Sequence, residues 1–257
     1  MLVAKGIGVV ITTSDFTKMK PYLELCMRSL AQQQGADFEV VLSCMSNARQ
    51  SVEVPVGWPE RLTVVHTPDN RIESVGWCAS RARNAGAMRC PREYLLFVDG
   101  DCMFPTNALA WAQDRLDQGA FVRFAVANSR CDPTQLPEIL LELANPKSVP
   151  VCGGSHGAVA VSRTAWEECG GYDEEFRGWG GDDQEFYERA IRYSHRVTAD
   201  SEAAGIWVLH LKHPAWTPAN HDVPGKKRNN DRYWVSTNTK LKTIPITWGG
   251  LAWKVQQ

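Results

Sequence analysis

Short, continuous apolar runs recur along the first hundred residues, with polar and amphipathic stretches between them. Runs of this length without a polar break are typical of strands buried on both faces, as in a parallel sheet between helices. Since these runs alternate with helical patterns, the sequence predicts an α/β fold with a Rossmann-like, mixed but mostly parallel central sheet flanked by helices. The expected strands are at 8–12, 38–42, 62–66 and 94–98.

Two segments between these strands have helical character. The first begins near Pro21, a residue type common in the first turn of helices, and its Leu23, Met27 and Leu30 share one face at helical spacing. A second helix is expected at 73–88, where small residues would allow close packing under the sheet.

The pattern changes beyond Pro105, where shorter and more varied elements are expected. Thr106 can cap the first of the helices there. We find no internal repeat, low-complexity tract or clear linker, so we expect the two halves of the chain to share one sheet. The expected elements are a helix at 107–116, a strand at 121–127, a helix at 136–143, a glycine-rich bend at 152–157, a strand at 158–161, a short helix around Trp166 and a strand at 206–210.

The strand at 94–98 is followed by two carboxylates one residue apart, Asp99 and Asp101. Open α/β sheets bind ligands just beyond the carboxyl ends of their strands, and Gly100 lets the chain turn there. Two hard oxygen donors so close together suit Mg²⁺ or Mn²⁺ holding a diphosphate. Asp-Gly is also common in turns, so this motif alone is a weak signal.

The composition is ordinary for a soluble globular protein, with 44% hydrophobic and 22% charged residues. A formal net charge of −1 gives no broad field to attract nucleic acid or an anionic membrane. The apolar runs are too short to span a bilayer and the first residues lack a signal-peptide layout, which predicts a cytoplasmic protein. The eight cysteines form no C-x-x-C pair and are expected to be reduced thiols in the core.

A second acidic segment lies at 178–186, where three glycines bracket Trp179 and precede Asp182 and Asp183. Asp182 can cap the helix that begins there, with Glu185 completing a capping box. Negative charge at a helix start also suits the macrodipole. This structural interpretation does not require Asp183. Since carboxylates at the mouth of a Gly/Trp loop suit a base beside an aromatic platform, Asp183 is our candidate general base.

Two imidazoles lie at and just beyond the end of the last expected strand, His210 and His213. A lone histidine at a strand end is more often a satisfied polar residue than a ligand. A metal held by carboxylates needs a third donor, however, and imidazole with Asp suits Mn²⁺, so we favour His210 over His213. The polar segment 214–231 carries a basic run at 226–228, which is either a solvated loop or a lid whose cations cover a diphosphate.

Taken in order, these motifs resemble those of glycosyltransferases of the GT-A fold, most closely the family-2 type. The resemblance includes the galactosyltransferase-like module shared with β-1,4-galactosyltransferases, chondroitin polymerases and polypeptide N-acetylgalactosaminyltransferases. It implies one catalytic domain over 1–257, with a nucleotide-sugar-binding half at 1–105 and an acceptor-binding half with a C-terminal lid at 106–257. The matching segments are 9–13, 82–86, 97–101, 153–154, 178–183 and His210.

The resemblance also implies a nucleotide-sugar donor, commonly a UDP-sugar, and a divalent metal. Asp101 and His210, with Asp99, would bind Mn²⁺ or Mg²⁺, and Asp99 would also lie near the ribose. The implied donor-binding residues are Thr12, Arg83, Asp99, Gly100, Gly153 and Gly154.

For the acceptor side, the resemblance assigns the role of general base to Asp183. Asp182 would contact the acceptor, at a position where the family carries Glu. Trp179, Gly180 and Gly181 complete the implied acceptor-binding set.

A second departure from the family concerns the nucleotide base. Many relatives carry an Asp just after the second strand that binds uracil, whereas 41–46 of this chain contains no acidic residue. Base recognition would then fall to Asp69, Asn70 or Arg83.

The expected reaction is direct displacement at the anomeric carbon with inversion, in which Asp183 takes the proton of the acceptor hydroxyl. The acceptor would be a glycan, a peptide or another hydroxyl-bearing molecule, and the near-neutral charge neither supports nor excludes a nucleic acid. Two alternatives stay open. A nucleotidyltransferase would need a basic, glycine-rich phosphate loop, which 12–16 does not offer, and a non-catalytic carbohydrate-binding protein could use the same scaffold.

Overall fold

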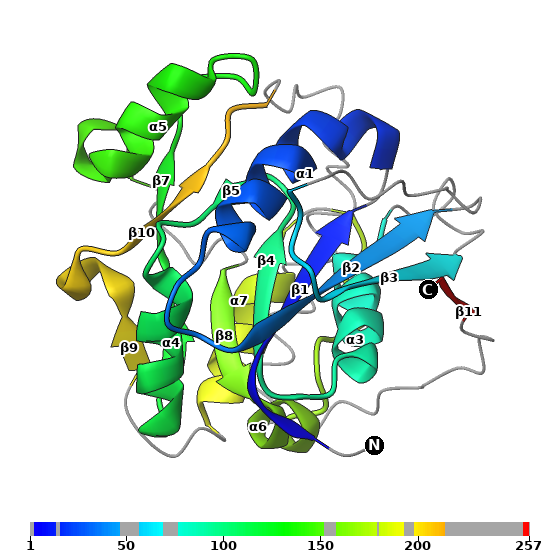
Figure 1. The fold of residues 1–257 in the computed structure, drawn as a ribbon. Coiled ribbons are helices and arrows are strands. Elements are labelled where there is room, and N and C mark those ends of the chain that lie inside the picture. Colours follow the sequence, from blue (N-terminus) through cyan, green and yellow to red (C-terminus); the bar gives the residue numbers. More distant parts are fainter. Residues whose placement is uncertain are drawn as a thin grey trace.

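The computed structural model describes residues 3–13, 16–46, 57–68, 77–151, 158–178, 180–192, 198–213 and 254–256. Within these ranges the chain forms an eight-stranded sheet flanked by helices and a separate sheet of three short strands (Figure 1). Both predictions of fold class, an α/β protein and a parallel centre to its sheet, are confirmed.

The main sheet has the strand order β11-β3-β2-β1-β4-β8-β6-β9. Its first half supplies four parallel strands, β3, β2, β1 and β4. β8 then pairs antiparallel with β4, so segments from both halves of the chain lie in one sheet. The bounds are β1 Ala4–Thr13, β2 Phe38–Ser46, β3 Leu62–Pro68, β4 Arg92–Asp99, β6 Phe121–Arg123, β8 Val159–Ser162, β9 Thr198–Asp200 and β11 Lys254–Gln256.

Helices bury both faces of this sheet, which is why its central strands read as uninterrupted apolar runs. Alternate residues point to opposite faces, so Val9 and Ile11 lie in the core shared with α1 and α4. Val10 lies in the other core, with α3, α6 and α7. The bounds are α1 Phe16–Ala31, α3 Ala79–Arg89, α4 Ala108–Asp117, α5 Leu136–Ala144, α6 Arg163–Glu168 and α7 Asp182–Ile191, with 3₁₀ turns at Pro146–Ser148 and Ser201–Ala204.

The second sheet brings a late segment of the chain to the end of β4. Its order is β5-β10-β7, with β5 at Cys102–Met103, β10 at Trp207–His210 and β7 at Ala125–Asn128. It lies beside α5 at the upper left of Figure 1, and Ile139 of α5 packs into the core beneath it. Because β10 runs antiparallel to β5, the end of β10 reaches the turn at the end of β4.

Four helix starts differ from the sequence prediction, and that of α7 is described with the candidate site. α1 begins at Phe16 rather than near Pro21, because the buried ring of Phe16 packs edge to face against Trp58 and extends the helix backwards. The helix expected at 73–88 begins at Ala79, after Cys78 accepts a hydrogen bond from Arg81 N as its cap.

The third helix, α4, is capped by Asn107 instead of Thr106, and the Asn107 side chain makes no capping hydrogen bond. The strand expected at 121–127 is divided at Phe124 into β6 and β7, which belong to different sheets. Buried apolar residues occur in both parts and at Phe124 between them, so periodicity could not reveal the division. β5, β9 and β11 are too short to give a sequence pattern.

Small residues bring α3 into close contact with the sheet, as the sequence predicted. A Cβ at Gly86 would lie 2.5 Å from Val10 Cγ1 and 3.3 Å from Ser43 Cβ. These distances leave no room for a side chain, so glycine at this position fixes the height of α3 above β1 and β2.

Seven of the eight cysteines lie in the described residues, and all seven are free thiols, as expected. Burial raises the pKa of Cys26, Cys44, Cys78 and Cys90, which keeps these thiols protonated and inert. None of the helices in this part of the chain combines the length and the apolar character that crossing a bilayer requires.

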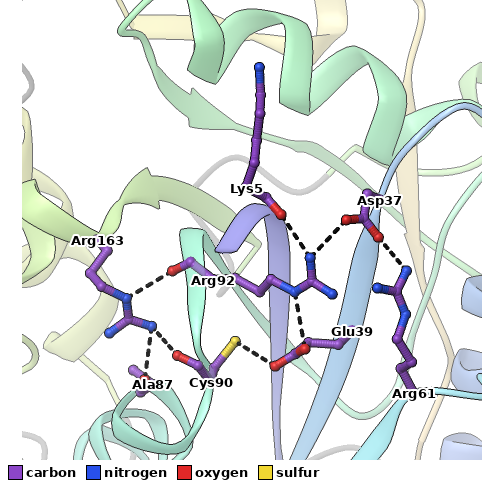
Figure 2. Close-up of polar contacts among 8 residues, drawn as sticks. All are labelled: Lys5, Asp37, Glu39, Arg61, Ala87, Cys90, Arg92 and Arg163. Carbon is purple, nitrogen blue, oxygen red and sulfur yellow. Dashed lines mark hydrogen bonds and ion pairs between the residues drawn. The ribbon is translucent and has the colours of Figure 1, made fainter. Parts of the chain in front are cut away.

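Two arginines organise the edge of the sheet where β4 begins (Figure 2). Arg92 pairs with Asp37 at 2.8 Å and Glu39 at 3.0 Å. Arg163 donates to the backbone carbonyls of Arg92, at 2.8 Å, and of Ala87 and Cys90. It thereby ties the end of α3 to the start of β4.

We predict that Arg163→Met lowers the free energy of unfolding by about 2–4 kcal/mol, because it removes a buried charged donor from three carbonyl groups. Urea denaturation monitored by circular dichroism measures the change. Glu167→Gln is the control, since Glu167 is 58% exposed and lies 3.7 Å from Arg163 Nη1, and it should cost less than about 0.5 kcal/mol. Equal effects of the two substitutions would contradict this account.

Candidate active site

The turn after β4 carries the first acidic pair. Asp99 is the last residue of β4, and Gly100 lies directly over α1, where a Cβ would lie 2.7 Å from Leu23 Cδ2. Asp101 is 8% exposed, and its backbone carbonyl accepts a hydrogen bond from Leu211 N at 2.8 Å. The turn is therefore fixed on one side by α1 and on the other by the segment just beyond β10.

Both candidate histidines lie beside Asp101. Its Oδ2 is 3.4 Å from His210 Nε2 and 3.8 Å from His213 Nε2. The two rings meet edge to face, with centroids 5.2 Å apart. Potential ligand atoms of all three residues lie within 4.8 Å of one another. Pairing of β10 with β5 produces this arrangement, because it places His210 opposite Cys102.

One carboxylate and two imidazoles form a donor set that suits Mn²⁺ and similar divalent ions better than Mg²⁺, which prefers oxygen. Burial raises the pKa of Asp101, but the hydrogen bond and charge of His210 and the charge of His213 lower it more, and the net shift is downward. Burial lowers the pKa of His210, but the hydrogen bond and charge of Asp101 together with the charge of Asp99 raise it more, and the net shift is upward. The three side chains could thus hold a divalent cation at the end of β4.

Arg83 of α3 connects the end of β4 with the second acidic segment. Its guanidinium is 2% exposed and lies over the ring of Tyr172, 5.0 Å from the centroid. Nη2 donates to Asp99 Oδ1 at 3.0 Å. Nη1 donates to Asp182 Oδ2 at 2.7 Å and forms an ion pair with Asp183 Oδ1 at 2.9 Å. Carboxylates that are widely separated in sequence therefore meet on one cation.

The start of α7 differs from the expected capping box. The cap residue is Gly181, whose φ of 89° is left-handed, and Asp182 is the first helical residue. Both carboxylate oxygens of Glu185 accept hydrogen bonds from Arg189, each at 2.6 Å. The cap is a glycine, so the first side chains of α7 are those of Asp182 and Asp183, and both pair with Arg83.

Three aromatic rings pack together next to this group of acids. Tyr172 stacks on Phe186 of α7, with centroids 3.9 Å apart, and Phe97 of β4 meets both rings edge to face. Asn84 fixes the backbone of Tyr172 by hydrogen bonds to its N and O, at 2.9 and 2.8 Å. The motif of arginine and asparagine on α3 thus positions both the acids and the segment leading to them.

The electrostatic environment makes Asp183 a suitable base. Burial raises the pKa of its carboxyl well above the usual range, and Asp182 and Asp99 add to the shift, whereas Arg83 opposes it. In its ionised form, a carboxylate with an elevated pKa binds a proton more tightly than a free aspartate does. Its side chain retains 24% exposure, so a substrate can reach it.

The remaining predicted residues divide into two groups. Thr12 lies level with Asp99 at the end of β1, and its buried Oγ1 has no hydrogen-bond partner among the described residues. Gly180 has open space where a Cβ would lie. Outside the described residues lie Gly153, Gly154, Trp179, Asp69, Asn70 and the lid proposed at 226–228.

Sequence reasoning missed the ion pairs of Arg83, since it assigned this residue to the donor. It also kept His213 only as the alternative to His210, whereas the structure places both beside Asp101. The H-x-x-H spacing was visible in the sequence, but the turn that brings both rings to one carboxylate was not.

Comparison with protein families identifies two matching segments. The model of glycosyl transferase family 2 matches residues 9–140, which is more than half of the chain. A second model, described as the N-terminal domain of galactosyltransferase, matches residues 146–214. A search of curated protein sequences finds no significant match.

Solved structures share the fold at low sequence identity. TarS of S. aureus, residues 1–349 in complex with UDP-GlcNAc, has a TM-score of 0.57 and 16% identity, over 82% of this chain and 59% of that one. GalNAc-T7 with UDP, GalNAc and Mn²⁺ has a TM-score of 0.52 and 15% identity, over 89% of this chain and 47% of that one. The chain thus spans less than two thirds of either, and the likeness shows the fold alone.

We predict that the protein binds Mn²⁺ and that Asp101→Asn weakens this binding by at least about tenfold, because it removes the carboxylate on which both imidazoles converge. Electron paramagnetic resonance of free Mn²⁺ in a titration measures the affinity. Asp114→Asn is the control, since Asp114 is an exposed residue of α4 that pairs with Arg115. Wild-type affinity in Asp101→Asn would rule out this metal site.

Proposed function

Because the chain belongs to glycosyl transferase family 2, we propose that it transfers a sugar from a nucleotide-sugar to an acceptor hydroxyl. The observation that carries the proposal is a pair of acidic clusters that meet at the end of β4. Asp99 and Asp183 pair with Arg83, and Asp101, two residues after Asp99, lies beside two histidines. UDP complexes are recorded for TarS and GalNAc-T7, which supports UDP as the nucleotide.

The donor would bind across the ends of β1 and β4. Asp99 keeps 40% exposure of its side chain while it accepts from Arg83, so it can also contact a ribose hydroxyl. Thr12 lies level with it and offers a hydroxyl without a hydrogen-bond partner among the described residues. Gly100, together with Gly153 and Gly154, completes the donor site that we propose.

A divalent metal, Mn²⁺ or Mg²⁺, would be held by Asp101 and His210, with His213 as the further donor that the structure brings near. The one-carboxylate, two-imidazole set fits Mn²⁺ better. Asp99 is the other carboxylate we expected at the metal, and its pairing with Arg83 makes it the weaker candidate. When bound, such an ion supplies positive charge that stabilises a departing diphosphate.

Asp183 is the proposed general base. Its carboxylate takes the proton of the acceptor hydroxyl as that oxygen forms a bond to the anomeric carbon. The bond between this carbon and the diphosphate oxygen breaks, and the nucleoside diphosphate leaves with the electron pair. Attack from the face opposite the leaving group inverts the anomeric centre.

The acceptor would lie at the start of α7, in contact with Trp179, Gly180, Gly181 and Asp182. It is a glycan, a peptide or another molecule with a free hydroxyl. The basic segment at 226–228 is proposed as a lid that covers the diphosphate and excludes water.

We predict that Asp183→Asn lowers kcat at least about 100-fold, because the amide cannot accept the proton, while the Kd for UDP changes less than about threefold. A panel of UDP-sugars with Mn²⁺, read by UDP release and product mass, identifies the donor, and calorimetry gives the Kd. Glu168→Gln, an exposed substitution on α6, should behave as wild type. Full turnover by Asp183→Asn would exclude this residue as the base.

A further inference from the structure

We infer that Arg83 is a positioning residue, a permanent internal cation that joins the tip of β4 to the start of α7 and aims Asp183 at the reacting centre. This inference rests on the proposed function. It departs from the assignment of Arg83 to the donor, because the structure surrounds its guanidinium with the protein's own carboxylates.

The geometry shows how Arg83 is engaged. Nη2 of the guanidinium pairs with Asp99 Oδ1 at 3.0 Å. Nη1 pairs with Asp182 Oδ2 at 2.7 Å and with Asp183 Oδ1 at 2.9 Å. Tyr172 covers one face of the guanidinium. With 2% exposure, little of the side chain is left for a bound nucleotide.

The charges explain why a cation is required at this position. Asp99, Asp182 and Asp183 all approach one point, and like charges at such distances repel strongly in a partly buried site. The pKa of Arg83 is raised well above its usual value, since these carboxylates outweigh the effect of burial, so its charge is permanent. Arg83 therefore allows the three acids to assemble before any ligand is present.

The contacts also divide the two aspartates at the end of β4 between two functions. Asp99 is held by Arg83, whereas Asp101 faces His210 and His213. The second aspartate, not the first, is consequently the one free to serve a metal. Arg83 is the cause of this difference, because it holds the Asp99 side chain on the side of the site where α7 begins.

Arginine suits this role better than lysine. Its planar fork presents separate N–H donors in fixed directions, and here the two terminal nitrogens serve acids from two different elements. A lysine ammonium at the same place could supply the charge but not the two directions. We therefore expect Arg83→Lys to restore only part of the activity that Arg83→Gln removes.

The test compares Arg83→Gln and Arg83→Lys with Arg92→Gln as the matched control. Arg92 is also a buried arginine paired with two carboxylates, but it lies at the opposite end of β4 (Figure 2). We expect Arg83→Gln to lower kcat at least about 100-fold with less than about threefold change in donor KM, and Arg83→Lys to recover at least about tenfold of the loss. Arg92→Gln should lower stability without lowering kcat of the folded protein.

Hydrogen exchange provides a readout that does not depend on activity. Amides at 185–189, whose helical hydrogen bonds run back to the carbonyls at the start of α7, should exchange faster in Arg83→Gln than in Arg92→Gln. The two variants are compared under conditions equally far from their unfolding midpoints. If wild-type protein transfers no sugar from any donor, the proposed function fails, while this exchange result still tests the positioning role. Should Arg83→Gln not fold, Arg83→Lys is compared with wild type in the same way.

Two results would overturn the inference. A large rise in donor KM or in the Kd for UDP with kcat retained would make Arg83 a donor contact. Losses of kcat and of exchange protection no greater than those of Arg92→Gln would make its role merely structural.

Discussion

Neutralisation of clustered negative charge is the constraint on which the candidate site depends. Four aspartates gather at the carboxyl edge of the sheet, and within the described residues they face one guanidinium and two imidazoles. Removing one partner of a buried ion pair typically costs about 3–5 kcal/mol, since it leaves a charge uncompensated. Loss of Arg83 would leave three of the four carboxylates without the cation they share, and α3 is the element that places this cation among them.

Much of this edge could be predicted from the sequence because it lies directly beyond apolar runs. A run such as 94–98 has few alternatives to a buried strand, and the residues just past the end of such a strand lie where α/β sheets bind ligands. Asp99 and Asp101 were placed in this way. His210 could be chosen because it ends another apolar run and because a carboxylate site needs a nitrogen or oxygen partner.

The features that could not be predicted depend on contacts between distant segments. Arg83 and Asp182 are 99 residues apart, and no local pattern indicates that they meet. The cap of α7 is Gly181 rather than Asp182, and the side chains of Asp182 and Glu185 pair with Arg83 and Arg189, which come from other positions in the chain. Phe124 separates β6 from β7 within one short segment, because β6 pairs with β8 in one sheet and β7 pairs with β10 in the other.

The two ends of β4 differ in their charge balance, and the difference favours the carboxyl edge as the candidate site. At the start of the strand, Arg92 and Arg61 face Asp37 and Glu39, so that positive and negative side chains balance and the pairs stabilise the fold (Figure 2). At its end, among the described residues, acids outnumber permanent cations. A balanced cluster has no electrostatic need for a ligand, whereas an acidic excess assembled around one fixed cation favours a second cation beside it. A cation bound there could in turn hold an anionic diphosphate, so the acidic excess supports the nucleotide-sugar site proposed above.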